Sequence, residues 1–325
     1  MAETRVGGAA DAPKLRRAGV ADYAPTYGAL AALVLLFVVN AFVTPNFLDA
    51  NNFRNILLQV APTVLVAVGM TYVIATGGID LSVGSIMAVA SAVAAVSLGR
   101  GVGVAVLLAL VAAVAVGALN GALISGFRIQ PIIVTLASLI TGRGVAQVIS
   151  NGGQLIPFDN PRFAWLGQGY LGPVPVQVVV MLLVVAAAIF AMRATSFGRY
   201  VAAVGGNEAA ARLAGVRVNR AKITVYALSG LLAGLAGLIE TARLSASDAQ
   251  KVGLNIELDA IAAVVVGGTP LTGGRATVVG TLIGALIMQL ITTSFNMNGI
   301  SFAWSLVIKA AIIILAVYIQ RPKTA

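Results

Sequence analysis

The chain has 325 residues, of which 59% are hydrophobic and 10% are charged, whereas a soluble domain usually carries about 25% charged residues. A water-soluble protein of this length could not bury so much apolar surface in one core, so the composition excludes a soluble globular fold and indicates a membrane protein. The chain has no cysteine and no histidine, which excludes disulfide frameworks, thiol nucleophiles, most zinc sites and every catalytic arrangement that needs histidine.

Long apolar runs predict the membrane-spanning helices, because a helix needs about 20 residues to cross ~30 Å of hydrocarbon. We predict an all-α, polytopic transmembrane bundle of about ten spans, at residues 28–44, 55–76, 82–99, 103–125, 131–150, 176–193, 223–242, 258–268, 276–294 and 302–320. The eighth run is too short to cross unaided, so we expect neighbouring helices to bury it and irregular backbone to continue it. Residues 28–320 are thus one transmembrane domain between a disordered tail, 1–27, and a short tail, 321–325.

The basic residues predict the orientation of the bundle. A net charge of +10 would suggest nucleic-acid binding in a soluble protein, but here Lys and Arg flank apolar runs, so we expect no nucleic-acid partner. Placing the N-terminus in the cytoplasm puts most basic residues inside, including those of the loop 194–222, and an even number of spans puts the C-terminus inside too. The first run could instead be a cleavable signal sequence, but no convincing cleavage site follows it.

Small residues recur on one face of several predicted helices. Three glycine pairs are each spaced by four positions, at Gly117/Gly121, Gly230/Gly234 and Gly280/Gly284. Such spacing lets helix backbones approach closely, and we expect these pairs to serve ordinary helix packing.

Two glycine-rich breaks interrupt the apolar sequence, at Gly77-Gly78-Ile79-Asp80-Leu81-Ser82-Val83-Gly84 and Gly267-Gly268-Thr269-Pro270-Leu271-Thr272-Gly273-Gly274. Their shared pattern indicates an internal repeat, and matching breaks in two halves of a membrane protein often mark a transport pathway. The alternative is a tight turn in which glycine supplies a positive φ and Asp80 or Ser82 caps the next helix. Our candidates for the translocation path or gate are Gly77, Gly78, Asp80, Leu81, Ser82, Gly84, Asn120, Gln130, Thr135, Gly267, Gly268, Thr269 and Pro270.

The loop 194–222 contains one strongly specified helix. Its residues are Gly205, Gly206, Asn207, Glu208, Ala209, Ala210, Ala211, Arg212, Leu213, Ala214 and Gly215. Asn207 is a good N-cap, Glu208 complements the N-terminal dipole, the alanines favour helix and Gly215 suits a C′ stop. A helix of two turns, about 10 Å long, is not stable alone in water. It must therefore pack on its own membrane domain, on lipid headgroups or on a partner protein.

At these segments the sequence resembles the membrane-spanning permease subunits of bacterial ABC importers for simple sugars, the ribose/xylose/galactose-type family. The resemblance rests on the order and spacing of Thr71–Ser85, Leu119–Ser125, Ile129–Ala137, Gly205–Gly215, Tyr226–Gly237 and Glu257–Arg275. The stretch Gly142–Gln147 looks most like the galactofuranose-type permeases.

The resemblance implies a bacterial inner-membrane assembly of two permease subunits, identical or homologous, with two cytoplasmic ATPase subunits and a periplasmic sugar-binding protein. It implies that Asn207–Gly215 is the coupling helix that docks on the ATPase. The chain departs from the general importer motif, which has three residues between its Glu-Ala-Ala and its glycine, because four residues separate Ala210 from Gly215. The binding protein would set most of the selectivity for a monosaccharide, so we expect the path itself to be nearly featureless.

No Gly-Lys pair and hence no phosphate-binding loop occurs in the sequence, so we expect ATP and Mg²⁺ on the partner ATPase, no cofactor on this chain and no enzymatic activity. An ion- or proton-coupled transporter would need carboxylates within its spans, and only Asp80, Glu240 and Asp259 come close. Glu240 could also pair with Arg243 on its own helix face.

An intramembrane hydrolase is the remaining alternative. Without histidine or cysteine it would need a Ser-Lys pair, for which Lys309 with Ser301 or Ser305 is available. We favour a structural interpretation in which Lys309 reaches out to the membrane surface.

Overall fold

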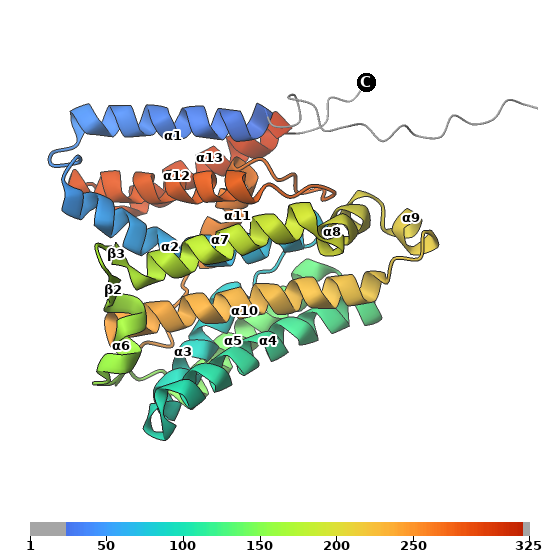
Figure 1. Cartoon of the computed structure of the whole chain (residues 1–325), viewed down its shortest axis with the longest axis horizontal. Helices are drawn as coiled ribbons and strands as arrows, with labels where there is room; N and C mark the ends of the chain where they lie inside the picture. The colour runs from blue at the N-terminus through green and yellow to red at the C-terminus, as the bar shows by residue number, and fades with distance from the viewer. Residues whose placement is uncertain (1–23, 321–325) are drawn as a thin grey trace, which may run out of the picture.

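The computed structural model describes residues 24–320, which form a bundle of helices lying side by side along one direction (Figure 1). The prediction of an all-α polytopic bundle is confirmed. The predicted spans correspond to α1 (Ala24–Val43), α2 (Ala50–Ala75), α3 (Val83–Ser97), α4 (Val102–Gly126), α5 (Pro131–Ile149), α7 (Val176–Ala194), α10 (Val218–Leu244), α11 (Ile256–Val266), α12 (Val278–Met297) and α13 (Phe302–Gln320).

Among the described residues, 8 helices are long and apolar enough to cross a membrane, and α13 adds a shorter apolar stretch at Phe302–Tyr318. The short eighth run forms α11, whose 11 residues give a length of about 16 Å, roughly half the hydrocarbon thickness. Residues 24–27, predicted to be part of the tail, form the first turn of α1. The rest of that tail and residues 321–325 lie outside the described residues.

The connections contain short elements that the apolar pattern did not predict: η2 (Leu98–Arg100), α6 (Pro161–Gln168), α8 (Ser196–Gly206), β1 (Ile156–Pro157), β2 (Tyr170–Leu171), β3 (Val174–Pro175) and β4 (Ala246–Ser247). β1 pairs with β4 and β2 with β3, both antiparallel. The two unpredicted helices carry readable caps, since Asn160 accepts a hydrogen bond from the amide of Phe163 and Thr195 from that of Phe197. Below, the two ends of the bundle are called the α6 end and the α9 end, after α6 and α9 (Glu208–Leu213).

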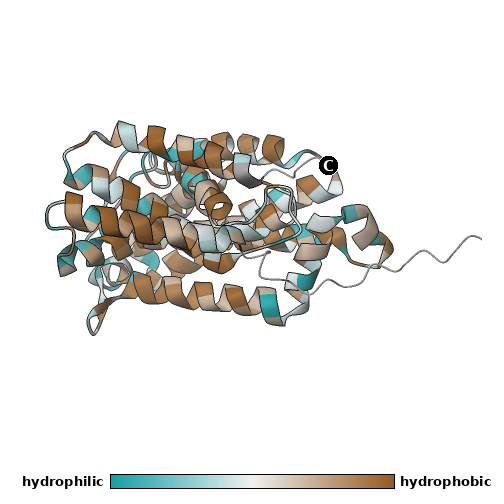
Figure 2. Ribbon diagram, turned by 90° about the horizontal axis from the view of Figure 1, so that it is seen from above, coloured by the Kyte–Doolittle hydropathy of each residue, from teal (hydrophilic) through white to brown (hydrophobic). Residues whose placement is uncertain are grey.

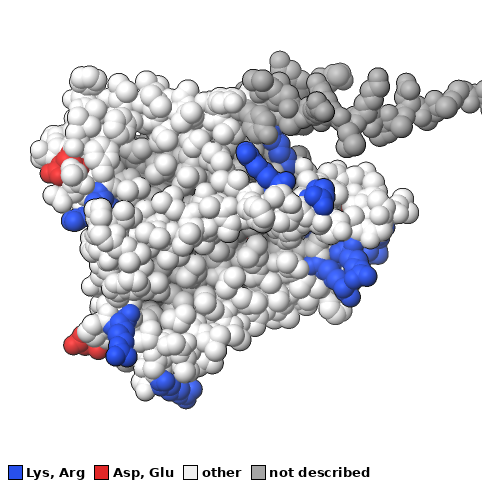
Figure 3. Space-filling view, viewed as in Figure 1, with Lys and Arg blue, Asp and Glu red and all other residues white. Residues whose placement is uncertain are grey.

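Burial divides the helices into an inner and an outer set. α2, α3 and α10 are largely buried, whereas α1, α4, α5 and α7 are buried over a third of their length or less. Figure 2 shows hydrophobic residues on the outer surface of the bundle, and on the face in Figure 3 the charged residues lie at the two ends with an uncharged band between them. This is the surface that a lipid bilayer requires.

Glycine allows α4 to pack closely against α10. Gly117 of α4 faces Gly230 of α10, and a Cβ on either glycine would overlap a backbone carbonyl oxygen of the opposite helix, that of Tyr226 or of Ala113. Gly284 of α12 lies in the same way against Ala263 of α11. The predicted packing role of these glycines is confirmed.

A bulky side chain at the α4–α10 contact should therefore weaken the bundle. We expect Gly230→Val to lower the free energy of unfolding by about 1–3 kcal/mol, because overpacked cores must shift backbone. Thermal unfolding in detergent, followed by size-exclusion chromatography, measures the loss. The control is Gly103→Val on α4, where a Cβ has nothing within 4 Å; an equal loss in both variants would contradict the packing role of Gly230.

Candidate functional site

Both glycine breaks form turns that need glycine. In the first, Gly77 has φ +79°, and in the second Gly268, Gly273 and Gly274 have φ values of +92°, +84° and +81°. L-residues rarely adopt such values, so glycine is required there. The turn interpretation is confirmed for these positions, but the surroundings of the two breaks show more than turns.

The two breaks meet at the α9 end, and a third glycine segment joins them. The amide of Gly274 donates a hydrogen bond of 2.9 Å to the carbonyl oxygen of Ala75, the last residue of α2. Gly205, near the end of α8, is packed so closely that a Cβ there would overlap the Ala75 oxygen and lie 2.5 Å from the amide nitrogen of Gly274. A Cβ on Gly273 would lie 2.9 Å from the amide nitrogen of Gly77. We call Ala75, Gly77, Gly205, Gly273 and Gly274 the glycine junction.

The predicted short helix follows the junction directly. It is α9, which projects beyond the main bundle (Figure 1). The Asn207 side chain accepts a hydrogen bond of 2.9 Å from the amide of Ala210, and Gly215, at φ +82°, closes the other end. The amide of Val216 donates to the carbonyl of Ala211 and that of Gly215 to Arg212, which is a Schellman motif. Both caps are therefore confirmed.

Glu208 ties α9 to the start of α10. Its carboxylate accepts a hydrogen bond of 2.6 Å from Lys222 Nζ and one of 3.0 Å from the Arg212 guanidinium. The hydrogen bond from Lys222 is the main reason why the pKa of Glu208 lies below its usual range despite partial burial. The positive charge of Lys222, and the hydrogen bond and charge of Arg212, lower this pKa further. Ala211 is buried against the bundle, whereas Leu213 is 91% exposed. The helix is thus held in place while it presents an apolar side chain outward.

Asp80 is the centre of a buried polar network. Its Oδ1 accepts hydrogen bonds from the amide and the hydroxyl of Ser82, at 3.0 and 2.5 Å, and its Oδ2 accepts one of 2.9 Å from the Ser229 hydroxyl of α10. Asn120 of α4 donates to the Ser82 hydroxyl at 2.9 Å and accepts from Ser138 of α5 at 2.5 Å. Asp80, Ser82 and Asn120 are fully buried. In this conformation they join the first break to three helices and do not line an open cavity.

The other predicted path residues lie in different places. Thr135 donates hydrogen bonds to the carbonyl oxygens of Ile79 and Pro131, which holds α5 against the first break. Gln130 is exposed just before α5, and Leu81 is half-buried. In the second break, Gly267 and Gly268 are buried and Pro270 is half-buried. The Thr269 hydroxyl lies 2.9 Å from that of Thr277, the residue before α12.

Gly84 marks a further meeting point inside the bundle, where the N-termini of α3 and α11 face each other. A Cβ on Gly84 would overlap the carbonyl oxygen of Gly253 and lie 2.6 Å from Oε2 of Glu257. The Glu257 carboxylate thus lies at two positive helix ends. Arg143 of α5 fixes the segment before α11 by donating hydrogen bonds of 3.0 and 2.8 Å to the carbonyl oxygens of Ala249 and Val252.

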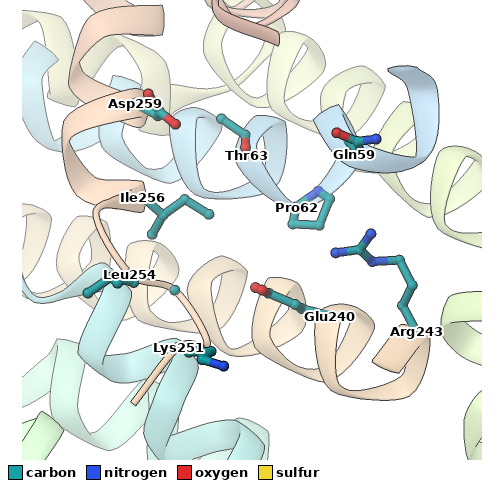
Figure 4. Close-up of a pocket in the computed structure, with 10 residues that line it drawn as sticks. Gln59, Pro62, Thr63, Glu240, Arg243, Lys251, Leu254, Ile256 and Asp259 are labelled. Atoms are coloured by element: carbon teal, nitrogen blue, oxygen red, sulfur yellow. The ribbon is translucent and has the colours of Figure 1, made fainter. Parts of the chain in front are cut away.

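A polar cavity of about 160 Å³ opens beside this segment. Figure 4 shows it between α2, α10 and the start of α11. Its polar lining combines an amide, a hydroxyl, two carboxylates and two cationic groups, from Gln59, Thr63, Glu240, Asp259, Arg243 and Lys251. We call this cavity the polar vestibule.

Two expectations about charged residues in this region need correction. In the described part of the chain Glu240 and Arg243 do not approach within ion-pair distance, and both side chains line the vestibule. Lys309 does not reach out to the membrane surface: it is 6% exposed, and its Nζ lies 2.9 Å from Oδ1 of Asp259. Ser305 donates to the carbonyl of Phe302. The structure therefore uses Lys309 as a partner for Asp259 and shows no Ser-Lys hydrogen bond there.

Residues 52–317 match the protein family described as "branched-chain amino acid transport system / permease component". The chain belongs to this permease family. It is accordingly a multi-pass inner-membrane permease subunit and not an enzyme.

The permease has curated relatives along almost its full length. It is 46% identical to the ribose import permease protein RbsC of Escherichia coli (strain K12) over 90% of this chain and 93% of the relative. It is 39% identical to the galactofuranose transporter permease protein YtfT of the same organism, over 90% and 89%. The L-arabinose ABC transporter permease protein AraH of Azospirillum brasilense is 38% identical, over 96% and 92%. The identity to the ribose permease exceeds that to the galactofuranose permease, so the comparisons do not single out galactofuranose.

The ion pairs of Glu208 give the permease a testable pH dependence. Because the pKa of Glu208 is lower in the folded protein than its unfolded value of about 4.3, the stabilisation of α9 is present above that value and is lost as the pH falls through the folded pKa. At pH 7 we expect Glu208→Gln to speed amide hydrogen exchange in residues 208–215 roughly two- to fivefold, the range for exposed ion pairs.

This difference should shrink once the pH is low enough to protonate Glu208 in the native protein. Asp159→Asn, which changes an exposed carboxylate at the α6 end, is the control and should leave the exchange of residues 208–215 unchanged. Equal exchange of Glu208→Gln and the native protein at pH 7 would show that the two ion pairs do not hold α9.

Proposed function

We propose that this permease forms the translocation path of an ATP-driven importer for a monosaccharide. A separate cytoplasmic ATPase binds ATP and Mg²⁺ and drives alternating access, a periplasmic binding protein delivers the sugar, and a second permease subunit completes the path. The names of the relatives support the substrate class, since they describe ribose, galactofuranose and L-arabinose transport. The chain itself carries no phosphate-binding loop.

The observation that carries the proposal is the connection of α9 to both glycine breaks. A short helix that is capped at both ends, exposed and outside the bundle is suited to docking in a groove of a partner protein. Its preceding residue pair, Gly205 and Gly206, packs against Ala75, Gly273 and Gly274. We therefore assign residues 205–215 as the coupling helix and the glycine junction as the point where its movement reaches α2, α11 and α12.

The basic residues support an orientation with α9 in the cytoplasm. Arg193, Arg199, Arg212, Arg217, Arg220, Lys222 and Arg275 lie at the end of the bundle that carries α9. By the positive-inside rule this end faces the cytoplasm, which places both termini there and the polar vestibule on the periplasmic half. Amides, hydroxyls and carboxylates are suitable hydrogen-bond partners for the hydroxyl groups of a sugar. The vestibule is therefore our candidate for the outer part of the path, and the buried Asp80 network for a closed gate.

Disrupting both ends of α9 tests the coupling assignment. We expect Glu208→Lys combined with Gly215→Pro to abolish ATP-driven monosaccharide uptake and capture of the ATPase, while membrane insertion persists. The first change removes the ion pairs, and proline cannot adopt the φ of +82° at Gly215. Uptake and co-purification are measured in cells that also express the ATPase and the binding protein.

A matched double variant at the α6 end provides the control. Asp159→Lys with Gly152→Pro also reverses an exposed acidic residue and places proline at a positive φ, +86°, and it should keep the ATPase bound. An unchanged rate of uptake in the α9 variant would show that α9 is not the coupling helix. Peptidase activity of the pure chain with no ATPase captured would overturn the transport proposal.

The glycine junction can be tested separately from docking. Gly205→Ala forces the junction apart, whereas in the adjacent Gly206→Ala the new Cβ has nothing within 4 Å. We expect Gly205→Ala to bind the ATPase normally but to slow uptake by about 5- to 150-fold, the range of coupling free energies of about 1–3 kcal/mol. Gly206→Ala should transport normally. Equal rates in both variants would exclude the junction as a mechanical connection.

A further inference from the structure

A second cavity, of about 790 Å³, opens at the α9 end between α1, α7, α8 and α12. Its volume lies within the range of about 300–1,000 Å³ that is usual for small-molecule sites. It is separate from the polar vestibule, and the two share none of their lining residues. We call it the basic cavity because of the side chains that line it.

The charge of the basic cavity is of one sign. Arg193, Arg199 and Arg275 contribute to its lining, and no carboxylate does so among the described residues. Arg199 donates a hydrogen bond of 2.8 Å to the Ser196 hydroxyl, and within the described part of the chain neither Arg193 nor Arg199 has a carboxylate within 4.0 Å. On the face shown in Figure 3, the charged side chains visible at this end are all basic. The cavity is therefore complementary to an anion.

The backbone adds to the positive electrostatic potential that the arginines create in the basic cavity. The wall of the cavity includes residues 276–280, where α12 begins. The first turn of α12 carries no acidic residue, so the positive end of its dipole is not compensated there by a side chain of its own. The cavity thus brings this helix end together with Arg193 of α7, Arg199 of α8 and Arg275 from the segment before α12.

The remaining walls are apolar. Ile189 and Met192 of α7 and Val279 of α12 line the cavity, and α7 and α12 are both helices that can span a membrane. A cavity with arginines near the ends of α7 and α12 and aliphatic side chains along both helices fits an amphiphile with an anionic head and apolar chains. A soluble anion would use the arginines but leave the aliphatic wall exposed to water.

We propose that the basic cavity binds an anionic phospholipid, with its phosphate at Arg193, Arg199 and Arg275 and its acyl chains along α7 and α12. The orientation proposed above places the site in the cytoplasmic leaflet, where basic pockets between transmembrane helices bind such headgroups. Gly274 belongs both to this cavity and to the glycine junction. Bound lipid therefore packs against the segment that connects α9 to the second break.

Native mass spectrometry of the full chain in detergent tests the site. The protein is titrated with phosphatidylglycerol and with phosphatidylcholine of identical acyl chains. We expect tighter binding of phosphatidylglycerol, and a loss of that binding by at least roughly fivefold in Arg193→Gln/Arg199→Gln, since one basic residue near an anionic membrane surface contributes about that factor. The control Arg100→Gln/Arg162→Gln removes the same charge at the α6 end and should bind normally.

A second pair of variants tests the cavity without changing charge. Ala202→Phe fills the cavity from α8 and should weaken phosphatidylglycerol binding, whereas the neighbouring Ala203 is exposed and does not line the cavity, so Ala203→Phe should not. Equal binding of the two lipids, or equal losses in matched variants, would overturn the proposal. So would displacement of the lipid by an equal concentration of inorganic phosphate, which would indicate a site for the free anion. Tighter lipid binding after removal of residues 1–23 would instead make the chain's own N-terminal segment the occupant.

Discussion

Hydrocarbon offers no hydrogen-bond partner to a peptide group, and this constraint determines where the backbone of the permease can leave the helical state. The chain interrupts its helices at the two glycine breaks and before α11, and neighbouring segments supply hydrogen-bond partners at these interruptions. The amide of Gly274 finds its acceptor on α2, and the carbonyls of residues 249 and 252 find a donor in Arg143. Peptide groups outside helices in a membrane domain need hydrogen-bond partners from neighbouring segments. These hydrogen bonds connect parts of the chain that are distant in sequence.

The glycine junction follows from the same constraint. Three backbone segments can satisfy one another only if they approach to hydrogen-bonding distance, and side chains at Gly205 or Gly273 would prevent that approach. The result is a rigid connection between the exposed helix α9 and the ends of α2 and α11. A packed junction of this kind transmits displacement, because close-packed interiors shift as units and do not deform continuously. In the transport cycle proposed above, such a connection would carry movement from α9 to the two glycine breaks.

Charge is distributed differently at the two ends of the permease. Lys and Arg gather at the α9 end, where α9 and the basic cavity lie, and the vestibule at the other end mixes both signs. Glu208 is an acidic residue among these basic ones: it pairs with Arg212 within α9, and its ion pair with Lys222 holds α9 to the start of α10. Buried charges are paired or hydrogen-bonded: Asp80 has hydroxyl and amide donors, and Lys309 has Asp259. The cost of burying an isolated charge explains why these partners are provided by other helices.

The sequence by itself determined the membrane class, the order of the spans, the short α11 and the caps of α9. Each depends on local information: apolar run length, small residues at helical spacing, or a cap residue next to its helix. The apolar pattern missed α8 and α6, although Thr195 and Asn160 are readable N-caps, because both helices lie between spans. Only the tertiary structure decided that the two breaks meet at Gly205, that Asp80 is enclosed by Ser229 and Asn120, and that Glu240 and Arg243 line a cavity and do not pair. Those outcomes depend on which helices become neighbours in space, and a periodic pattern along one helix contains no information about the partner across from it.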